Sequence, residues 1–237
     1  MQLKAYGHPA ASRTAGRGEG MTPQALFKGP NTLYIVAGRD HQQLLAPLVV
    51  TMISSLMFSL SEQENRAGKG LWPPALFALD ETAFSAPLQD LPKMLATSLG
   101  AGGRFMTVWH SVAQMRRHFG ADAAAEILAL SQAKVFMGSI TDDDTRAEVV
   151  KILGQRQQLD GINGTQPPGR GVDVMSAQAL QRTSTGEGLL IHEDLPPVIF
   201  RQRRHYLDRD LTALKGPPLQ VPTADARRGL ANLSSLT

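Results

Sequence analysis

The stretch Leu76-Phe-Ala-Leu-Asp80-Glu81 decides the fold class that we expect for this chain. Its four apolar residues are typical of a short buried strand, and the strand delivers two carboxylates to its carboxyl end. Ligands of open parallel sheets bind outside that end of the strands, so Asp80 and Glu81 are candidate site residues. A strand that simply runs into a polar loop explains the same six residues about equally well.

Around this stretch, short apolar runs alternate with segments of helical pattern. We expect strands over residues 32–38, 74–79, 104–110 and 133–137, and helices over 44–60, 88–98, 111–118, 121–130 and 141–153. Strands that alternate with helices at short spacing predict an α/β fold, with a mostly parallel sheet covered by helices on both faces. Two further strands are expected at Gly188–His192 and Val198–Arg203, joined around Pro196 and Pro197.

The two ends of the chain and two internal stretches have the composition of loops. Residues 1–30 and 211–237 are rich in Gly, Pro, Ala or Ser, and we expect flexible segments on either side of a folded portion over 31–210. Polar loops are expected over residues 62–71 and 155–171.

Composition narrows the function classes. With 237 residues, 42% of them hydrophobic and 19% charged, the chain can bury a real core. The absence of cysteine excludes disulfide frameworks, cysteine catalysis and thiolate zinc sites. The formal net charge of +3 does not by itself indicate nucleic-acid binding. The apolar stretch over 44–60 contains Pro47 and falls short of the roughly 20 residues of a spanning helix, so we interpret it as a buried helix and expect no membrane span.

A second signal, Trp109-His-Ser-Val-Ala-Gln114, follows the strand expected after Glu81. A polar side chain there could sense the γ-phosphate of a nucleotide across the edge of the sheet. Ser111 and Gln114 also have the spacing of a capping box, with Ser111 as N-cap and Gln114 reaching back. Both interpretations can hold together.

Several enzyme motifs do not occur in the sequence. The phosphate-binding loop needs G-x-x-x-x-G-K-[ST], and none of the seven lysines is followed by Ser or Thr. There is no G-x-S-x-G or H-E-x-x-H, and the six histidines show no metal-ligand spacing. His110 and His118 are eight positions apart, but we expect His110 at the end of a strand, which argues against a shared metal.

Basic residues cluster at two places. Arg201, Arg203, Arg204 and His205 form one cluster, and Arg227 with Arg228 forms another. A solvated surface is the ordinary explanation, and contact with phosphate groups is the more specific one.

From about Pro30 to Asp210, the chain resembles the coupling proteins of conjugation and type IV secretion, the TraG/TraD-like group of the FtsK/HerA-type translocases. Four stretches carry the resemblance in the right order: Thr32–Val36, Leu76–Glu81, Trp109–Gln114 with Phe119-Gly120, and Gly186–Leu190 through Pro196-Pro-Val to His205-Tyr206. The resemblance implies the C-terminal half of a RecA-like nucleotide-binding domain.

It also implies a hexamer on the cytoplasmic face of the membrane that hydrolyses Mg-ATP. Such a hexamer moves single-stranded DNA and attached relaxase into a secretion channel, and N-terminal helices tether it to the membrane. Without a P-loop, we expect Mg-ATP to bind only if another segment or partner chain completes the site. A truncated or split coupling protein, or an inert gene remnant, would each fit this pattern. The alternative function is a non-catalytic adaptor that binds relaxosome proteins or DNA.

Site residues carry over by position. Asp80 would be the acid that holds magnesium through water, and Glu81 the catalytic carboxylate. Ser111 and Gln114 match a Gln-Ser-x-x-Gln sensor motif in which His110 replaces the first glutamine. Many relatives place a trans-acting arginine just before the glycine-rich turn, where this chain has Leu99 and Gly100, and Arg104 is the nearby substitute.

Overall fold

A computed structural model describes residues 21–36, 42–138, 140–157 and 171–215. These residues belong to two units, one formed by residues 21–200 and another that includes residues 201–215. In chain order, the elements are α2 (Pro23–Phe27), α3 (Gln42–Ala67), β1 (Ala75–Leu79), α4 (Thr82–Ser85), α5 (Leu91–Ala101), β2 (Gly103–Thr107), α6 (Val112–Phe119), α7 (Ala121–Leu130), β3 (Ala133–Met137), α8 (Asp143–Leu153), β4 (Gln155–Gln157), β5 (Gly171–Asp173), α9 (Ala177–Gln181), β6 (Glu187–His192), β7 (Leu195–Arg201) and α10 (Arg209–Ala213).

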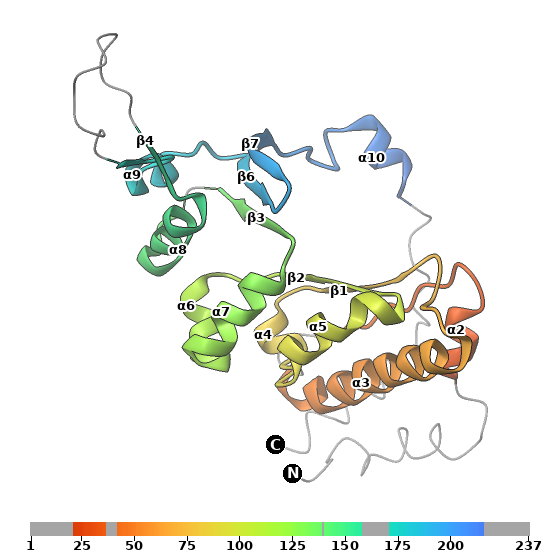
Figure 1. Cartoon of the computed structure of the whole chain (residues 1–237). Helices are drawn as coiled ribbons and strands as arrows, with labels where there is room; N and C mark the ends of the chain where they lie inside the picture. Colours follow the sequence, from red (N-terminus) through yellow and green to blue (C-terminus); the bar gives the residue numbers. More distant parts are fainter. Residues whose placement is uncertain (1–20, 37–41, 139, 158–170, 216–237) are drawn as a thin grey trace. The chain divides into compact units, whose positions relative to one another are not determined.

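Strands β1 and β2 form a parallel pair whose register places Phe77 beside Phe105. The two rings stack with centroids 4.8 Å apart and join the larger of two hydrophobic clusters. Helices α3 and α5 contribute to that cluster and lie along one side of the pair (Figure 1). The α/β class that the sequence predicts is confirmed.

The opposite face of β1 and β2 is exposed. Because side chains alternate along a strand, Leu76, Ala78, Arg104 and Met106 all lie on the face away from Phe77 and Phe105. Leu76 is 65% exposed and Met106 is 53% exposed. Parallel sheets are normally covered on both faces, so this one-sided burial is unusual.

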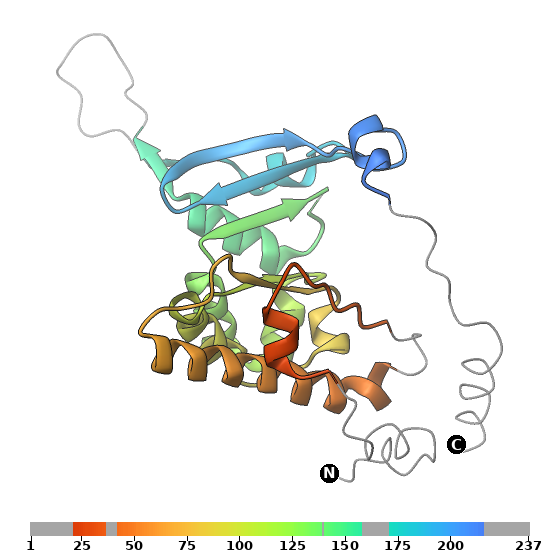
Figure 2. The same cartoon turned by 90° about the vertical axis from the view of Figure 1, so that its right-hand side faces the viewer.

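Strands β3, β6 and β7 lie side by side in that order (Figure 2), and a second hydrophobic cluster includes residues of β6 and contacts Phe136 of β3. Leu189 and Ile191 of β6 pack with Val149 of α8 and Leu180 of α9. Strand β3 pairs antiparallel with β6, and β4 pairs antiparallel with β5. Among the described strands, parallel pairing is therefore limited to β1 and β2.

Helix α3 is longer than the sequence predicts. The sequence predicts a helix over 44–60 and a polar loop over 62–71, but the helix continues to Ala67. The i,i+4 ion pair between Glu62 and Arg66 supports the added turn, and Gly68, at a φ of +66°, ends it. Its Ile53, Met57 and Leu60 lie in the core, whereas Phe58 is 68% exposed, so only one face of the helix is buried. By length and composition alone, Leu44–Ala67 could also cross a membrane.

Other segments differ in secondary structure from what the sequence predicts, whereas the flexibility expected at the two ends stays a prediction. Residues 32–36 form no strand and expose Tyr34 and Val36, while residues 37 and 38 lie outside the described part. The segment expected to be flexible up to residue 30 contains α2, capped by Thr22, and the expected tail contains the end of α10. The expected loop over 155–171 begins with β4; residues 158–170 are not described.

Two elements near the C-terminus also differ from expectation. Helix α9 was not predicted, and Pro196 and Pro197 lie inside β7 rather than between two strands. Strand β7 is at the edge of its sheet, where a proline without an N–H group is tolerated. The turn falls instead at Glu193 and Asp194.

Helices α6 and α8 are joined by a buried hydroxyl. The Oγ1 atom of Thr145 accepts the Val112 N–H at 2.9 Å and donates to Asp142 Oδ2 at 2.5 Å. Asp142 caps α8 by also accepting the Thr145 N–H. These hydrogen bonds, with Thr145 as the main contributor, hold the pKa of the Asp142 carboxyl below its ordinary value although burial acts in the opposite direction.

We predict that Thr145→Val lowers the free energy of unfolding by about 1–3 kcal/mol, because the buried Val112 N–H loses its acceptor. Urea denaturation followed by circular dichroism measures this. Thr97→Val is the matched control, because Thr97 is exposed and bonds only the carbonyl one turn back. Equal effects of the two substitutions would contradict the prediction.

Candidate functional site

Asp80 and Glu81 follow β1 directly and stand at its carboxyl end. Asp80 is exposed, and its Oδ1 accepts the Glu81 N–H at 3.0 Å. Glu81 has φ 47° and ψ 50°, the left-handed conformation that non-glycine residues rarely adopt. Such strain is often concentrated at functional positions, and it turns the chain sharply from β1 into α4.

The second sequence signal lies at the same edge. The Val108 N–H donates to the Leu79 carbonyl at 3.0 Å, and the Thr82 N–H donates to the Val108 carbonyl at 3.1 Å. These two bonds continue the pairing of β1 and β2 beyond both strands. They place the Asp80–Glu81 turn beside the segment that leads into Trp109 and His110.

His110, Ser111 and Gln114 form the start of α6. Ser111 is the N-cap and accepts the Gln114 N–H at 3.1 Å. The Gln114 Oε1 accepts the His110 N–H at 3.0 Å, so the cap reaches one residue further back than the usual capping box. The capping interpretation of Ser111 and Gln114 is thus confirmed, and their role as phosphate sensors stays a prediction.

Arg104 lies away from these residues. It pairs with Leu76, four positions before Asp80, so about 13 Å of strand at roughly 3.3 Å per residue separate the two positions. Its guanidinium donates to the carbonyls of Leu99 and Gly103. The structure therefore brings Asp80, Glu81 and His110–Gln114 together at the carboxyl end of the β1–β2 pair. Arg104 lies near the amino end of the pair, away from these two carboxylates.

The residues at the carboxyl edge fit part of a magnesium–nucleotide site. Asp80 and Glu81 supply the oxygen atoms that Mg²⁺ prefers. Within the described ranges, no group of three or more His, Asp or Glu side chains could hold a metal. The two carboxylates suit a water-coordinated magnesium ion. A triphosphate would need further groups to balance its negative charge. His118 packs edge-on against Phe119 and belongs to no such group among the described residues.

Sequence reasoning missed two residues that shape this edge. Thr82 is completely buried and its hydroxyl donates to the Leu79 carbonyl, which closes the turn after β1. Ser85 donates from its hydroxyl to the Asp80 carbonyl at 2.5 Å. Hydroxyl residues two and five positions after a strand-end acid are too common to be recognised from one sequence.

Comparison with solved structures defines the class of the fold. The conjugative coupling protein TrwB matches this chain with a TM-score of 0.64 at 18% identity, covering 77% of this chain and 43% of TrwB. A structure of TrwB in complex with ADP and Mg²⁺ matches with the same TM-score. The chain therefore shares the fold of part of TrwB, in agreement with the α/β class that the sequence predicts.

Comparison with sequences indicates the family. Residues 74–190 match the family model described as the TraM recognition site of TraD and TraG. The VirD4 proteins of Rhizobium radiobacter and Agrobacterium fabrum are 23% and 22% identical over 201 and 194 residues, which is 80% and 77% of this chain. These matches support the prediction that the chain corresponds to the C-terminal part of a conjugative coupling protein of the TraG and TraD type. It spans 28% of the length of these VirD4 relatives.

Variants of Asp80 and Glu81 should show whether these two acids contribute to the stability of the fold. Asp80→Asn and Glu81→Gln should change the free energy of unfolding by less than about 0.5 kcal/mol, because neither side chain supports the core. Glu81→Gly should raise it by roughly 0.5–1 kcal/mol, since glycine adopts a φ of 47° without strain. Thermal and urea denaturation test this series. A clear loss of stability in Asp80→Asn or Glu81→Gln would mean that the acids are structural.

Proposed function

We propose that this chain is the C-terminal half of a DNA-translocating coupling ATPase that becomes active when a P-loop segment completes its nucleotide site. That segment belongs either to the same polypeptide or to a partner chain. In the complete protein, Asp80 would hold magnesium through water and Glu81 would orient or deprotonate the attacking water. His110, Ser111 and Gln114 would face the γ-phosphate, and Arg104 would act toward a neighbouring subunit.

The exposed face of β1 and β2 that carries Leu76 and Met106 is the main support for this proposal. Leu76 and Met106 are more than half exposed on a parallel pair whose other face is packed in the core. In the described residues, β1 and β2 pair only with each other, so both outer edges lack a neighbouring strand. A further layer of structure would bury the exposed side chains of this face, and further strands would pair with the two outer edges.

The setting of the proposed function is conjugative DNA transfer through a type IV secretion system. The assembled protein would be a hexamer that contacts single-stranded DNA, relaxase or other relaxosome proteins, and the secretion channel. It would work at the cytoplasmic face of the membrane. An adaptor without catalysis is the second candidate, and the match to a TraM recognition site favours it because that description names a protein contact.

The isolated chain should not hydrolyse ATP, because two carboxylates cannot by themselves bind a triphosphate against its own negative charge. A coupled assay for ADP release, with Mg²⁺ and single-stranded DNA present, measures turnover. Asp80→Asn is the control for contaminating activity. Magnesium- and DNA-dependent turnover that disappears in Asp80→Asn would show that the site is complete without a further segment.

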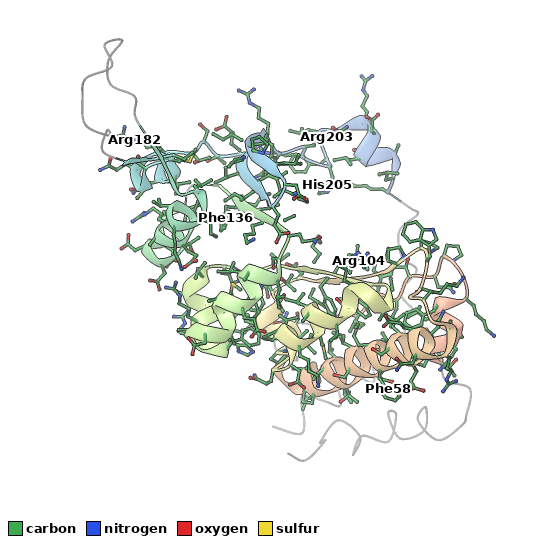
Figure 3. The ribbon with its side chains drawn as sticks, viewed as in Figure 1. Phe58, Arg104, Phe136, Arg182, Arg203 and His205 are labelled. Carbon is green, nitrogen blue, oxygen red and sulfur yellow. The ribbon has the colours of Figure 1, made fainter. Side chains whose placement is uncertain are left out.

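Covalent capture tests what covers the exposed sheet face. With p-benzoylphenylalanine in place of Leu76, irradiation of cells that make the protein should join this position to a segment of the polypeptide that carries G-x-x-x-x-G-K-[ST]. The matched control is the same group in place of Phe58, which is 68% exposed on α3 and points away from the β1–β2 pair (Figure 3).

Mass spectrometry of the crosslinked peptides identifies the sequence. Capture, at position 76 but not at position 58, of a segment from the polypeptide that carries the P-loop supports the proposed completion. Capture of relaxosome proteins alone would favour the adaptor. Capture of no polypeptide at either position would contradict both.

A further inference from the structure

Residues 201–215 are here called the basic segment, and the acids of this segment form ion pairs within it. Its two carboxylates, Asp208 and Asp210, both bind Arg203. The Arg203 Nε and Nη2 atoms lie 2.5 and 2.8 Å from the Asp208 oxygens, and Nη2 lies 3.0 Å from Asp210 Oδ2. Asp208 also caps α10 by accepting the Leu211 N–H at 3.1 Å. The contact with Asp208 raises the pKa of Arg203 and lowers that of Asp208.

Three further cations of the basic segment have no acidic partner. Arg204, Arg209 and Lys215 are exposed, and no carboxylate of the described residues forms an ion pair with any of them. The segment contains five Arg and Lys residues and two acids, so its formal charge is +3. The basic cluster that the sequence shows therefore divides into one internal clamp and a set of available cations.

An exposed aromatic side chain lies among these cations. Tyr206 is 60% exposed, and its ring meets His205 edge-on with centroids 5.4 Å apart. The Arg204 Nη1 atom donates to the Tyr206 hydroxyl at 3.5 Å. His205 and Arg203 occupy the stretch that leads into α10 (Figures 1 and 3).

The backbone around Tyr206 is held in place. The N–H groups of Leu207 and Asp208 both donate to the Arg204 carbonyl at 2.9 Å. The Thr212 hydroxyl donates to the His205 carbonyl at 2.5 Å. Together with the clamp on Arg203, these bonds present Arg204 and Tyr206 in a fixed arrangement. A ligand would thus bind without the cost of ordering this loop.

We infer that the basic segment is a binding surface for single-stranded DNA, in which Arg204 and Arg209 contact phosphates and a base stacks on Tyr206. Guanidinium groups match the geometry of phosphate oxygens, and an exposed aromatic ring offers a stacking surface only to unpaired bases. An acidic peptide would use the charges but would gain little from the planar ring. The choice of DNA rests on the proposed function, whereas the choice of a single strand rests on these side chains.

Fluorescence anisotropy of a 5′-fluorescein-labelled oligothymidylate, titrated with the purified chain at several KCl concentrations, tests the charged contacts. Affinity should fall as salt rises, and the double variant Arg204→Gln/Arg209→Gln should bind at least about tenfold more weakly. The slope of log affinity against log salt should shrink by about 0.7 for each phosphate that the variant no longer neutralises. The charge-matched control Arg117→Gln/Arg182→Gln removes two exposed arginines from the unit of residues 21–200 and should leave binding unchanged.

Substitution of Tyr206 tests the stacking. Tyr206→Leu should weaken binding about 5- to 150-fold, while Tyr206→Phe should retain it, because only the ring is required. Circular dichroism confirms that each variant is folded. Equal effects of Leu and Phe, equally tight binding to duplex DNA, or equal binding to polyglutamate of the same charge would each overturn the inference.

The titration needs neither nucleotide nor a P-loop segment. It therefore fails or succeeds independently of the capture experiment at position 76.

Discussion

The stacked pair of Phe77 and Phe105 is the contact on which the rest of the larger cluster depends. Since side chains alternate along each strand, burying these two rings fixes which residues of β1 and β2 face the core and which face outward. It also sets the register that carries Asp80 and Val108 to the same edge of the sheet. The same constraint that builds the core thus places the candidate acids beside the start of α6. It leaves Leu76 and Met106 exposed on the other face.

Two kinds of local pattern were sufficient to predict much of the fold from the sequence. Apolar runs that end in acids or glycine gave β1 and β3 within a residue of their observed bounds, and hydroxyl or acidic caps gave α6 and α8. Pairing could not be predicted, because whether β3 meets β6 depends on contacts far apart in the sequence. Residues 32–36 have strand-like composition but find no pairing partner among the described residues, so propensity alone was misleading. At the candidate site, the positions of Asp80, Glu81 and Ser111 followed from the sequence. The strained backbone of Glu81 and the buried Thr145 linking α6 to α8 did not, since both depend on three-dimensional packing.

Two arrangements of charge among the described residues bear on the proposals. Arg116 of α6 forms ion pairs with Asp144 and Glu148 of α8. These ion pairs and the Thr145 hydrogen bonds together link the two helices. In the basic segment, Arg203 holds two acids and leaves Arg204 and Arg209 available. A modest net charge therefore conceals a local concentration of positive charge. The proposed nucleotide edge and the proposed DNA surface are built from different residues, as a translocating enzyme would require.

The proposed function rests on the claim that another segment bearing a P-loop completes the sheet. Native mass spectrometry of the protein isolated from the cells that make it tests this claim most directly, with peptide sequencing of every component. We expect G-x-x-x-x-G-K-[ST] either in a polypeptide longer than 25.6 kDa that contains this sequence or in a partner present in stoichiometric amount. A 25.6 kDa chain found alone, or assembled only with copies of itself, would contradict the claim.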